Sequence, residues 1–226
     1  MKRQDKSLVS IGMPVYNGAH FLRGALDSLL KQEFEDFEIL ISDNASTDDT
    51  RSVCTEYIRQ DERIQYLRND TNIGALRNFN RVLSLARGKY FMWASYDDLW
   101  EPAFISKLVS ALEANPRAVF AFCSCYRMDP EGRILRANRL YKRLSHPNRL
   151  VRAQRYIWFP PREGRAMVFY GLMRTAVVKE MGGIKAFEQY DSSDDMFVLR
   201  LLLKGDFAFT EEFLFRKRDV PSSATF

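Results

Sequence analysis

Asp97 and Asp98 form an adjacent pair of carboxylates just beyond the apolar run YFMWAS, which ends at Ser95. Neighbouring carboxylates repel each other unless a positive charge lies beside them. Mg²⁺ or Mn²⁺ suits such a site because both ions bind carboxylate oxygens together with phosphate oxygens. The ion would act as a Lewis acid toward a diphosphate leaving group. The pair fits a second interpretation equally well, in which Asp98 caps a helix that begins near Pro102 and Asp97 faces water.

A second polar cluster, from Asp43 to Asp48, ends the apolar run FEILISD. A carboxylate at the end of a strand can accept a hydrogen bond from a ring N–H of a nucleotide base. Local turn chemistry is the alternative, since Asp, Asn and Ser fill turns for conformational reasons. Taken alone, the cluster favours the turn.

Asn72, Ile73 and Gly74, followed by Arg77, form a third candidate. Gly74 would let the backbone approach a ligand, and Arg77 would pair with a phosphate. A simple turn before a helix has the same sequence features.

Asp194 and Asp195 open the apolar segment 193–204. Carboxylates in the first turn of a helix are favoured by the helix dipole, so capping is expected for at least one of them. A carboxylate at this place could also be the general base that deprotonates an acceptor hydroxyl.

These clusters must be positioned by the elements around them. Apolar runs alternate with amphipathic segments over residues 1–100: the expected strands are LVSIGMPV, FEILISD, IQYLRN and YFMWAS, and the expected helices are 18–32, 50–60 and one ending near Gly88. This alternation predicts an α/β fold with a parallel sheet and helices on both faces. Ligands bind such sheets beyond the carboxyl ends of the strands, where the clusters 14–17, 43–48 and 95–98 fall.

The second half of the chain is less regular. We expect helices over 102–114, 175–181 and 193–204 and strands over 118–128, 167–174 and 207–218. Residues 130–165 carry no clear pattern.

Composition narrows the class of protein. The chain has 226 residues, of which 46% are hydrophobic and 28% charged, typical of a globular domain. Its 3 cysteines show no metal-ligand spacing, which disfavours a disulfide framework or a zinc site. The N-terminus lacks the apolar stretch of a signal peptide, and no run reaches the roughly 20 apolar residues of a membrane span. A cytoplasmic protein is expected.

The net charge of +5 is unevenly distributed, because the segment 133–155 contains basic residues and no acid. Apolar residues lie between the cations, so this segment is a candidate for peripheral contact with the inner face of a membrane or with a lipid diphosphate. A solvated face without a partner is the alternative. Nucleic acid is disfavoured because no aromatic or groove-reading motif accompanies the charge.

The order and intervals of these clusters resemble family 2 glycosyltransferases, which have the GT-A fold. The resemblance runs from about Ser10 to Arg216. The matching residues are Ser10 to Asn17, Phe37 to Asp48, Asn72 to Gly74 with Asn80, Gly88 to Tyr90, Asp97 and Asp98 with Pro102, Gly171 with Arg174, Gly182 with Gly183, and Asp194 ahead of Arg200.

The resemblance implies a Rossmann-like, mostly parallel central sheet, with residues 1–100 as the donor-binding half and 101–226 as the acceptor-binding half of one GT-A domain. It implies transfer of a sugar, with inversion, from a nucleotide diphosphate sugar to a hydroxyl acceptor in surface polysaccharide or glycan biosynthesis. The implied partners are a UDP-, GDP- or dTDP-sugar and a glycan or lipid-linked acceptor. The implied cofactor is Mg²⁺ or Mn²⁺.

The family's site residues carry over position by position. Asp97, supported by Asp98, would bind the metal and the sugar diphosphate, and Asp194, with Asp195 as the alternative, would be the base. Asp43 would bind the nucleotide base. The full set of implied nucleotide-binding residues is Pro14, Tyr16, Asn17, Asp43, Asn44, Asp48, Asn72, Gly74 and Arg77.

Two departures from the family pattern matter. Ser95 stands where the family often has the first acid of its metal loop, and the basic residues Arg216 and Lys217 stand where a histidine is common. Any diphosphate contact from that region would come from Arg216 or Lys217. The missing acid keeps open a non-catalytic nucleotide-sugar or glycan-binding module. A nucleotidyltransferase is disfavoured, because no glycine-rich basic loop follows the first strand.

Overall fold

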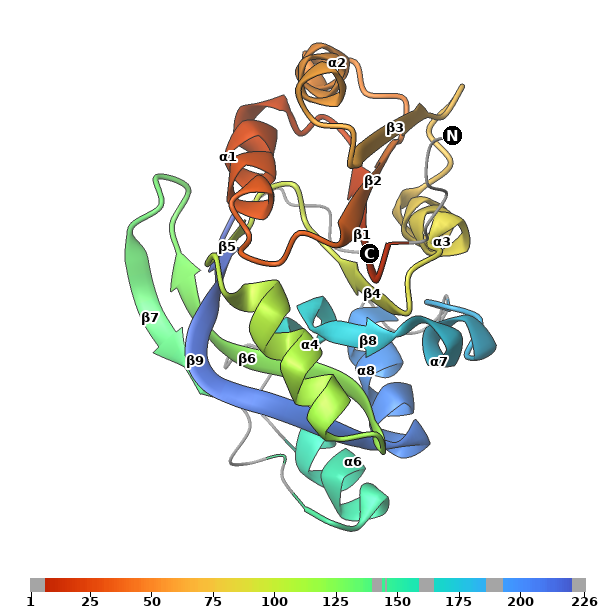
Figure 1. Cartoon of the computed structure of the whole chain (residues 1–226), viewed down its shortest axis with the longest axis vertical. Coiled ribbons are helices and arrows are strands. Elements are labelled where there is room, and N and C mark those ends of the chain that lie inside the picture. Colours follow the sequence, from red (N-terminus) through yellow and green to blue (C-terminus); the bar gives the residue numbers. More distant parts are fainter. Residues whose placement is uncertain (1–6, 140–143, 145, 159–164, 186–192, 221–226) are drawn as a thin grey trace.

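The computed structural model describes residues 7–139, 144, 146–158, 165–185 and 193–220. Its centre is a sheet of nine strands in the order β3-β2-β1-β4-β8-β6-β9-β5, with β7 paired to β6 (Figure 1). None of the helices in these residues is long and apolar enough to cross a bilayer.

The amino-terminal side of the sheet is parallel. Its strands are β1 (Val9–Val15), β2 (Phe37–Asp43), β3 (Ile64–Arg68) and β4 (Tyr90–Trp93). β1 lies between β2 and β4 and is buried along its whole length, as expected of an apolar strand covered on both faces.

Helices α1 (Ala19–Leu30), α2 (Thr50–Gln60) and α3 (Ala75–Leu85) connect these strands. Figure 1 shows α1 and α2 on one face of the sheet and α3 on the other. The chain steps from β1 to β2 to β3 and then returns across β1 to β4, and right-handed crossovers place helices on opposite faces when the direction reverses. The switch point, where ligands bind in such sheets, therefore lies between β1 and β4.

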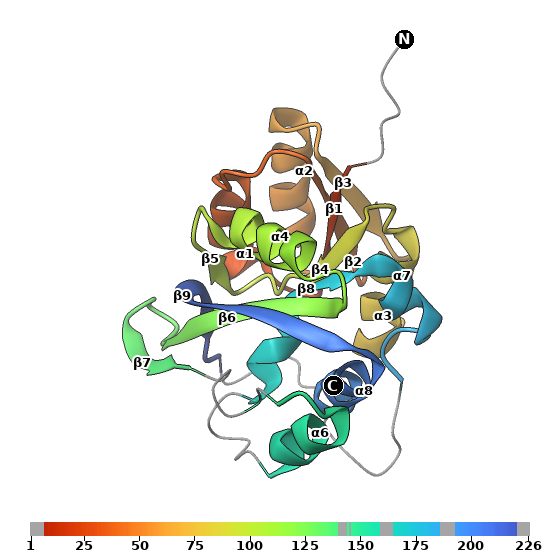
Figure 2. The same cartoon turned by 60° about the horizontal axis from the view of Figure 1, so that its bottom comes forward.

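The second half adds a mixed sheet. β8 lies antiparallel between β4 and β6, β9 runs parallel to β6, and β5 pairs antiparallel with β9. Figure 2 shows α4 on one side of the long β6–β9 pair and α6 and α8 on the other. The elements are β5 (Leu99–Trp100), α4 (Phe104–Ala114), β6 (Ala118–Met128), β7 (Ile134–Asn138), α6 (Arg149–Ile157), η2 (Arg165–Tyr170), β8 (Leu172–Arg174), α7 (Thr175–Glu180), α8 (Ser193–Lys204) and β9 (Asp206–Arg218).

One expected strand is wrong. The segment 167–174 forms a 3-10 turn, η2, followed by the short strand β8. Val168 and Phe169 are both fully buried although they are neighbours, which a helical turn permits and an extended strand with one buried face does not. Residues 130–165, which carried no pattern, contain β7 and α6 within their described part.

An aromatic cluster joins the two halves into one core. Trp93 of β4 stacks on Phe169 of η2 with ring centroids 4.8 Å apart, and Phe197 of α8 meets Trp93 edge-on at 5.1 Å. These contacts fix α8, which begins with Asp194 and Asp195, against the strand that leads to Asp97.

Candidate active site

The loops after β1 and β2 are bonded to each other at the carboxyl edge of the sheet. Asn17, in a left-handed conformation with φ of 50°, accepts a hydrogen bond from the Thr47 N–H at 2.8 Å. Its own N–H donates to Ser46 Oγ at 2.9 Å, and the Gly18 N–H donates to Thr50 Oγ1 at 2.9 Å. Beside this joint, Tyr16 is 42% exposed, and Pro14 is buried within β1.

Asp48 holds the starts of two helices together. Its carboxylate accepts hydrogen bonds from the Ala19 N–H at 3.1 Å and the Thr50 N–H at 3.0 Å. Burial raises the pKa of Asp48, but the hydrogen bonds from the Thr50 hydroxyl and from these two N–H groups outweigh it, and the pKa lies below its usual value. The ionised carboxylate also lies at two helix N-termini, where negative charge is favoured.

Asp43, at the end of β2, is fully buried and already bonded. Its Oδ1 accepts the Ser46 N–H at 2.8 Å, its Oδ2 accepts the Tyr66 hydroxyl at 2.6 Å, and Arg68 Nε lies 3.5 Å from Oδ2. The turn chemistry expected at this cluster is therefore present. A nucleotide base would reach the carboxylate only after Arg68, whose side chain is 36% exposed, or Tyr66 moved aside.

Asn44 organises the loop before α3. Its Oδ1 accepts from Asn69 Nδ2 and from the Ile73 N–H, both at 2.9 Å, and its Nδ2 donates to Asn72 Oδ1 at 2.7 Å. Asn72 Oδ1 also accepts the Gly74 N–H at 2.9 Å. Gly74 has φ of +85°, a conformation that side chains disfavour, so this turn requires glycine.

Arg77 lies exposed in the first turn of α3. A cation is unfavourable at a helix N-terminus, and no acid shares that turn. No salt bridge or hydrogen bond of Arg77 is present among the residues that the structure describes, which leaves its guanidinium available for an anion.

Asp97 is a buried carboxylate with one unsatisfied oxygen. The side chain is 1% exposed; Oδ1 accepts a hydrogen bond from Ser95 Oγ, and Oδ2 is buried without a partner among the described residues. Leaving a buried acceptor unpaired costs free energy, and a divalent cation would satisfy it.

Asp98 is used differently. It is fully buried, its Oδ2 lies 3.1 Å from Lys217 Nζ, and its Oδ1 accepts the Arg218 N–H at 2.9 Å. Burial raises the pKa of Asp98 to about 7 against the attraction of Lys217. Asp97 and Asp98 therefore differ in their partners. Asp98 binds the end of β9, whereas one carboxylate oxygen of Asp97 accepts no hydrogen bond from the described residues.

Lys217 and Tyr170 were not singled out as a pair by the sequence. Lys217 Nζ lies 4.7 Å from the centre of the Tyr170 ring, and burial raises the pKa of Tyr170 to about 12. Arg216, the other expected diphosphate contact, instead forms an ion pair with Glu101, with Nε 2.6 Å from the carboxylate. The sequence feature that could have indicated Lys217 is the run of three basic residues, 216–218, at the end of an expected strand.

Asp194 and Asp195 have separate surroundings at the start of α8. Asp194 Oδ1 accepts the Asp195 N–H at 2.8 Å, and Asp195 Oδ1 accepts the Tyr156 hydroxyl of α6 at 2.8 Å. Burial, and then the charge of Asp195, raise the pKa of Asp194, while the hydrogen bond from the Asp195 N–H and, less strongly, the charge of Lys217 oppose them. A carboxylate with a raised pKa is a stronger base.

Charged side chains of the loop after β4, of β9 and of the start of α8 all affect Tyr170. The charges of Lys217, Asp98, Asp97 and Asp194 all act on its phenol. The candidate metal ligand Asp97, the candidate base Asp194 and Lys217 thus all influence the pKa of the same phenol.

A divalent ion fits this chemistry through Asp97 alone. Within the described residues no group of three or more His, Cys, Asp or Glu side chains could hold a metal ion. Mg²⁺ is commonly bound by one or two carboxylates, with water and substrate phosphates completing its shell. The unpartnered Asp97 Oδ2 suits that arrangement.

The sheet order, the switch point and the acidic loop after β4 define a GT-A glycosyltransferase fold, as the sequence predicted. Residues 10–182 match the model of Glycosyl transferase family 2. The chain belongs to that family.

Curated relatives agree with this assignment. The putative teichuronic acid biosynthesis glycosyltransferase TuaG of Bacillus subtilis (strain 168) is 34% identical over 127 residues, which cover 56% of this chain and 50% of TuaG. The uncharacterized glycosyltransferase RP339 of Rickettsia prowazekii (strain Madrid E) is 33% identical over 129 residues, 57% of this chain and 39% of the relative. The chain thus spans half or less of the length of these two relatives.

Solved structures share the fold. TarS 1-349 of S. aureus in complex with UDP-GlcNAc has a TM-score of 0.73 at 18% identity, covering 95% of this chain and 59% of that one. The mannosyltransferase PcManGT of Pyrobaculum calidifontis in complex with GDP-Man and Mn²⁺ has a TM-score of 0.68 at 15% identity, covering 98% and 59%.

Proposed function

We propose that this chain transfers a sugar from a nucleotide diphosphate sugar to a hydroxyl acceptor, with inversion at the anomeric carbon, in the biosynthesis of a polysaccharide or related glycan. The observation that carries the proposal is Asp97: a buried carboxylate with an unpartnered oxygen, beyond β4, next to the switch point. Donor complexes of proteins with this fold support it, since TarS is seen with UDP-GlcNAc and PcManGT with GDP-Man and Mn²⁺.

In this proposal the donor binds to the loops that follow β1, β2 and β3. Tyr16 and Asn17 with Pro14 would line the nucleotide pocket, and Asp43 would accept from the base once Arg68 or Tyr66 moved. The Asn44 network shapes the turn at Gly74, whose exposed backbone a phosphate could approach. Arg77 would then pair with the phosphate.

The chemical step requires two opposed groups. A Mg²⁺ or Mn²⁺ ion held by Asp97 would neutralise the diphosphate leaving group. Asp194 would take the proton of the acceptor hydroxyl from the opposite side, because displacement with inversion needs the nucleophile and the leaving group in line. Asp98 and Lys217 hold the loop that presents Asp97, and Asp195 is bonded to Tyr156, which favours Asp194 as the base.

Thermal unfolding with and without nucleoside diphosphate and Mn²⁺ tests the donor site. We expect UDP or GDP to raise the Tm of the wild type only when Mn²⁺ is present, because binding to the folded state alone stabilises it. Asp97→Ala should lose this shift, and the control Asp36→Ala, which removes an exposed carboxylate, should keep it. A metal-dependent shift that survives in Asp97→Ala would overturn the assigned role of Asp97.

A non-catalytic binding module is the second candidate, and Ser95 is the observation in its favour. The Ser95 hydroxyl donates a hydrogen bond to Asp97 Oδ1. At the position of Ser95 the family often has another acid. Ser95→Asp should tighten Mn²⁺ binding in the presence of nucleoside diphosphate. Wild-type binding without turnover of any UDP-, GDP- or dTDP-sugar, in a donor hydrolysis assay, would favour the module.

A further inference from the structure

Helix α6 turns an apolar face outward. Leu150, Ile157 and Trp158 are 65%, 57% and 80% exposed. Leu150, Ile157 and Trp158 are seven and eight residues apart, so they lie on one side of a helix. We call these three residues the outer face of α6. The opposite side, with Arg152, Ala153 and Tyr156, is buried.

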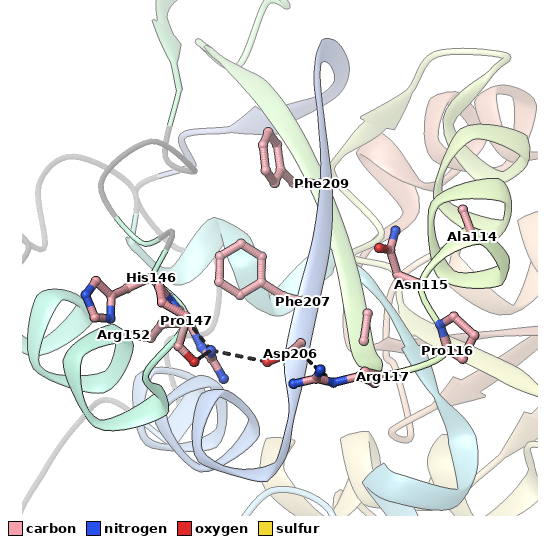
Figure 3. Close-up of a pocket in the computed structure, with 11 residues that line it drawn as sticks. Ala114, Asn115, Pro116, Arg117, His146, Pro147, Arg152, Asp206, Phe207 and Phe209 are labelled. Carbon is pink, nitrogen blue, oxygen red and sulfur yellow. Dashed lines mark hydrogen bonds and ion pairs between the residues drawn. The ribbon is translucent and has the colours of Figure 1, made fainter.

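The buried side fixes how α6 is rotated. Arg152 donates to the His146 carbonyl at 2.9 Å and to the Gly205 carbonyl at 2.9 Å. It also lies 3.3 Å from the Asp206 carboxylate (Figure 3). This guanidinium borders a hollow of about 460 Å³ at the start of β6 and β9. Tyr156 adds its hydrogen bond to Asp195. With two anchored side chains, α6 cannot turn its apolar residues inward.

The charge around the outer face is mostly positive: the hollow beside Leu150 is lined by Arg149, Lys185, Arg200 and Lys204 and by one acid, Glu180. Residues 133–155 contain no acid. Arg152 forms internal hydrogen bonds and Arg133 is paired with Asp129 at 2.6 Å. Arg149 and Arg155 of α6 lie exposed at the surface. An exposed Trp beside Leu and Ile, flanked by arginines, matches an anionic membrane–water interface, where Trp prefers to lie and basic groups meet acidic headgroups.

We propose that the outer face of α6 docks on an anionic lipid bilayer. The same helix bonds to Asp195, next to Asp194, so docking would hold the start of α8 close to the membrane. If the proposed function is correct, on which this second part rests, the acceptor is a lipid-linked hydroxyl presented at that surface.

Tryptophan fluorescence gives a specific readout. Of the 3 tryptophans, Trp93 and Trp100 are 0% and 4% exposed, whereas Trp158 is 80% exposed. Vesicles of phosphatidylcholine with phosphatidylglycerol should shift the emission to the blue, and pure phosphatidylcholine vesicles should not. Trp158→Phe should remove the shift while co-sedimentation with anionic vesicles persists. Binding should weaken as salt rises.

Matched substitutions locate the contact. Leu150→Glu and Ile157→Glu should each reduce co-sedimentation with anionic vesicles about tenfold or more, since each removes an apolar contact and adds a repelled charge. Ile58→Glu on α2, where Ile58 is 38% exposed, should leave it unchanged. Asp97→Ala should bind vesicles like the wild type, which separates this proposal from the proposed function.

Three outcomes would overturn the docking proposal. The first is no binding to anionic vesicles; the second is binding that Leu150→Glu and Ile157→Glu leave unchanged. The third is a wild-type dimer in sedimentation velocity that both substitutions dissociate, because the outer face would then be covered by a second copy of the chain.

Discussion

We call the loops after β1 and β2 the proposed donor edge, and the surroundings of Asp97 and Asp194 the proposed catalytic edge. The two edges are built from the same kinds of polar residues but use them in opposite ways. At the donor edge, Asn17, Asn44 and Asp48 spend their hydrogen-bonding groups on neighbouring backbone, and the loops become a fixed surface. At the catalytic edge, Asp97 keeps an unpartnered oxygen and the pKa of Asp194 is raised. The donor edge would therefore bind a ligand mainly through the fixed shape of its loops. At the catalytic edge, a bound cation or substrate would compensate the charge of the carboxylates.

Replacing the candidate base tests this contrast most strongly. Asp194→Asn should lower kcat about 10²- to 10⁴-fold, the usual contribution of a positioned base, while the metal-dependent Tm shift with nucleoside diphosphate persists. Asp195→Asn is the matched control and should retain much more activity. If Asp194→Asn transfers sugar at the wild-type rate and Asp195→Asn does not, the two roles are exchanged.

Removing the buried counter-charge should affect folding nearly as much. Lys217→Met leaves the Asp98 carboxylate uncompensated and should lower the free energy of unfolding by about 3–5 kcal/mol. Arg117→Met is the control, because that side chain is 90% exposed in its ion pair with Asp206 and exposed pairs contribute little. Urea denaturation at pH 7.5 measures both. Equal, small losses would show that the Asp98–Lys217 contact does not stabilise the loop.

Substitutions of two glycines, Gly74 and Gly183, compare how much backbone strain each position would add to the folded state. Gly74→Ala should cost about 1–2 kcal/mol, since φ is +85° but nothing lies within 4 Å of the added Cβ. Gly183→Ala should cost more, because its Cβ would lie 2.2 Å from Asn80 Oδ1 in addition to a φ of +67°. Urea denaturation of both variants gives the order, and a larger loss for Gly74→Ala would contradict it.

The pH profile should show the smallest change. Burial and the charge of Asp195 raise the pKa of Asp194, with Lys217 opposing. A base works only when ionised, so log kcat/KM should fall as pH drops through this raised value, above the ordinary carboxylate range near 4. Asp195→Asn removes one cause of the rise and should move the acid limb to lower pH. A limb that stays in place in Asp195→Asn would mean that burial alone sets it.

The parts of the structure that the sequence predicted are those set by local order. Periodicity placed α2 and α8 and the strand β2 at their observed bounds, because apolar spacing and the next turn decide these elements. The catalytic edge depends on long-range pairs that no local pattern encodes. Lys217 and Asp98 are separated by 119 positions, and Asn80 meets the Ile184 backbone across 104. Burial of neighbouring residues in η2 likewise depends on Trp93, far away in the chain.

The long strand β9 has a consequence for the newly made chain. It begins at Asp206, which forms an ion pair with a residue of α6, and ends at Arg218, whose Nε donates a hydrogen bond to the Asp97 carbonyl. The strand has 13 residues and spans roughly 40 Å. At about 5–20 residues per second, the ribosome adds the 119 positions between Asp98 and Lys217 in on the order of ten seconds. During that interval the parallel strands can pair, but the acidic loop has no buried partner. The buried partner of Asp98 is therefore in place only after β9 has been synthesised.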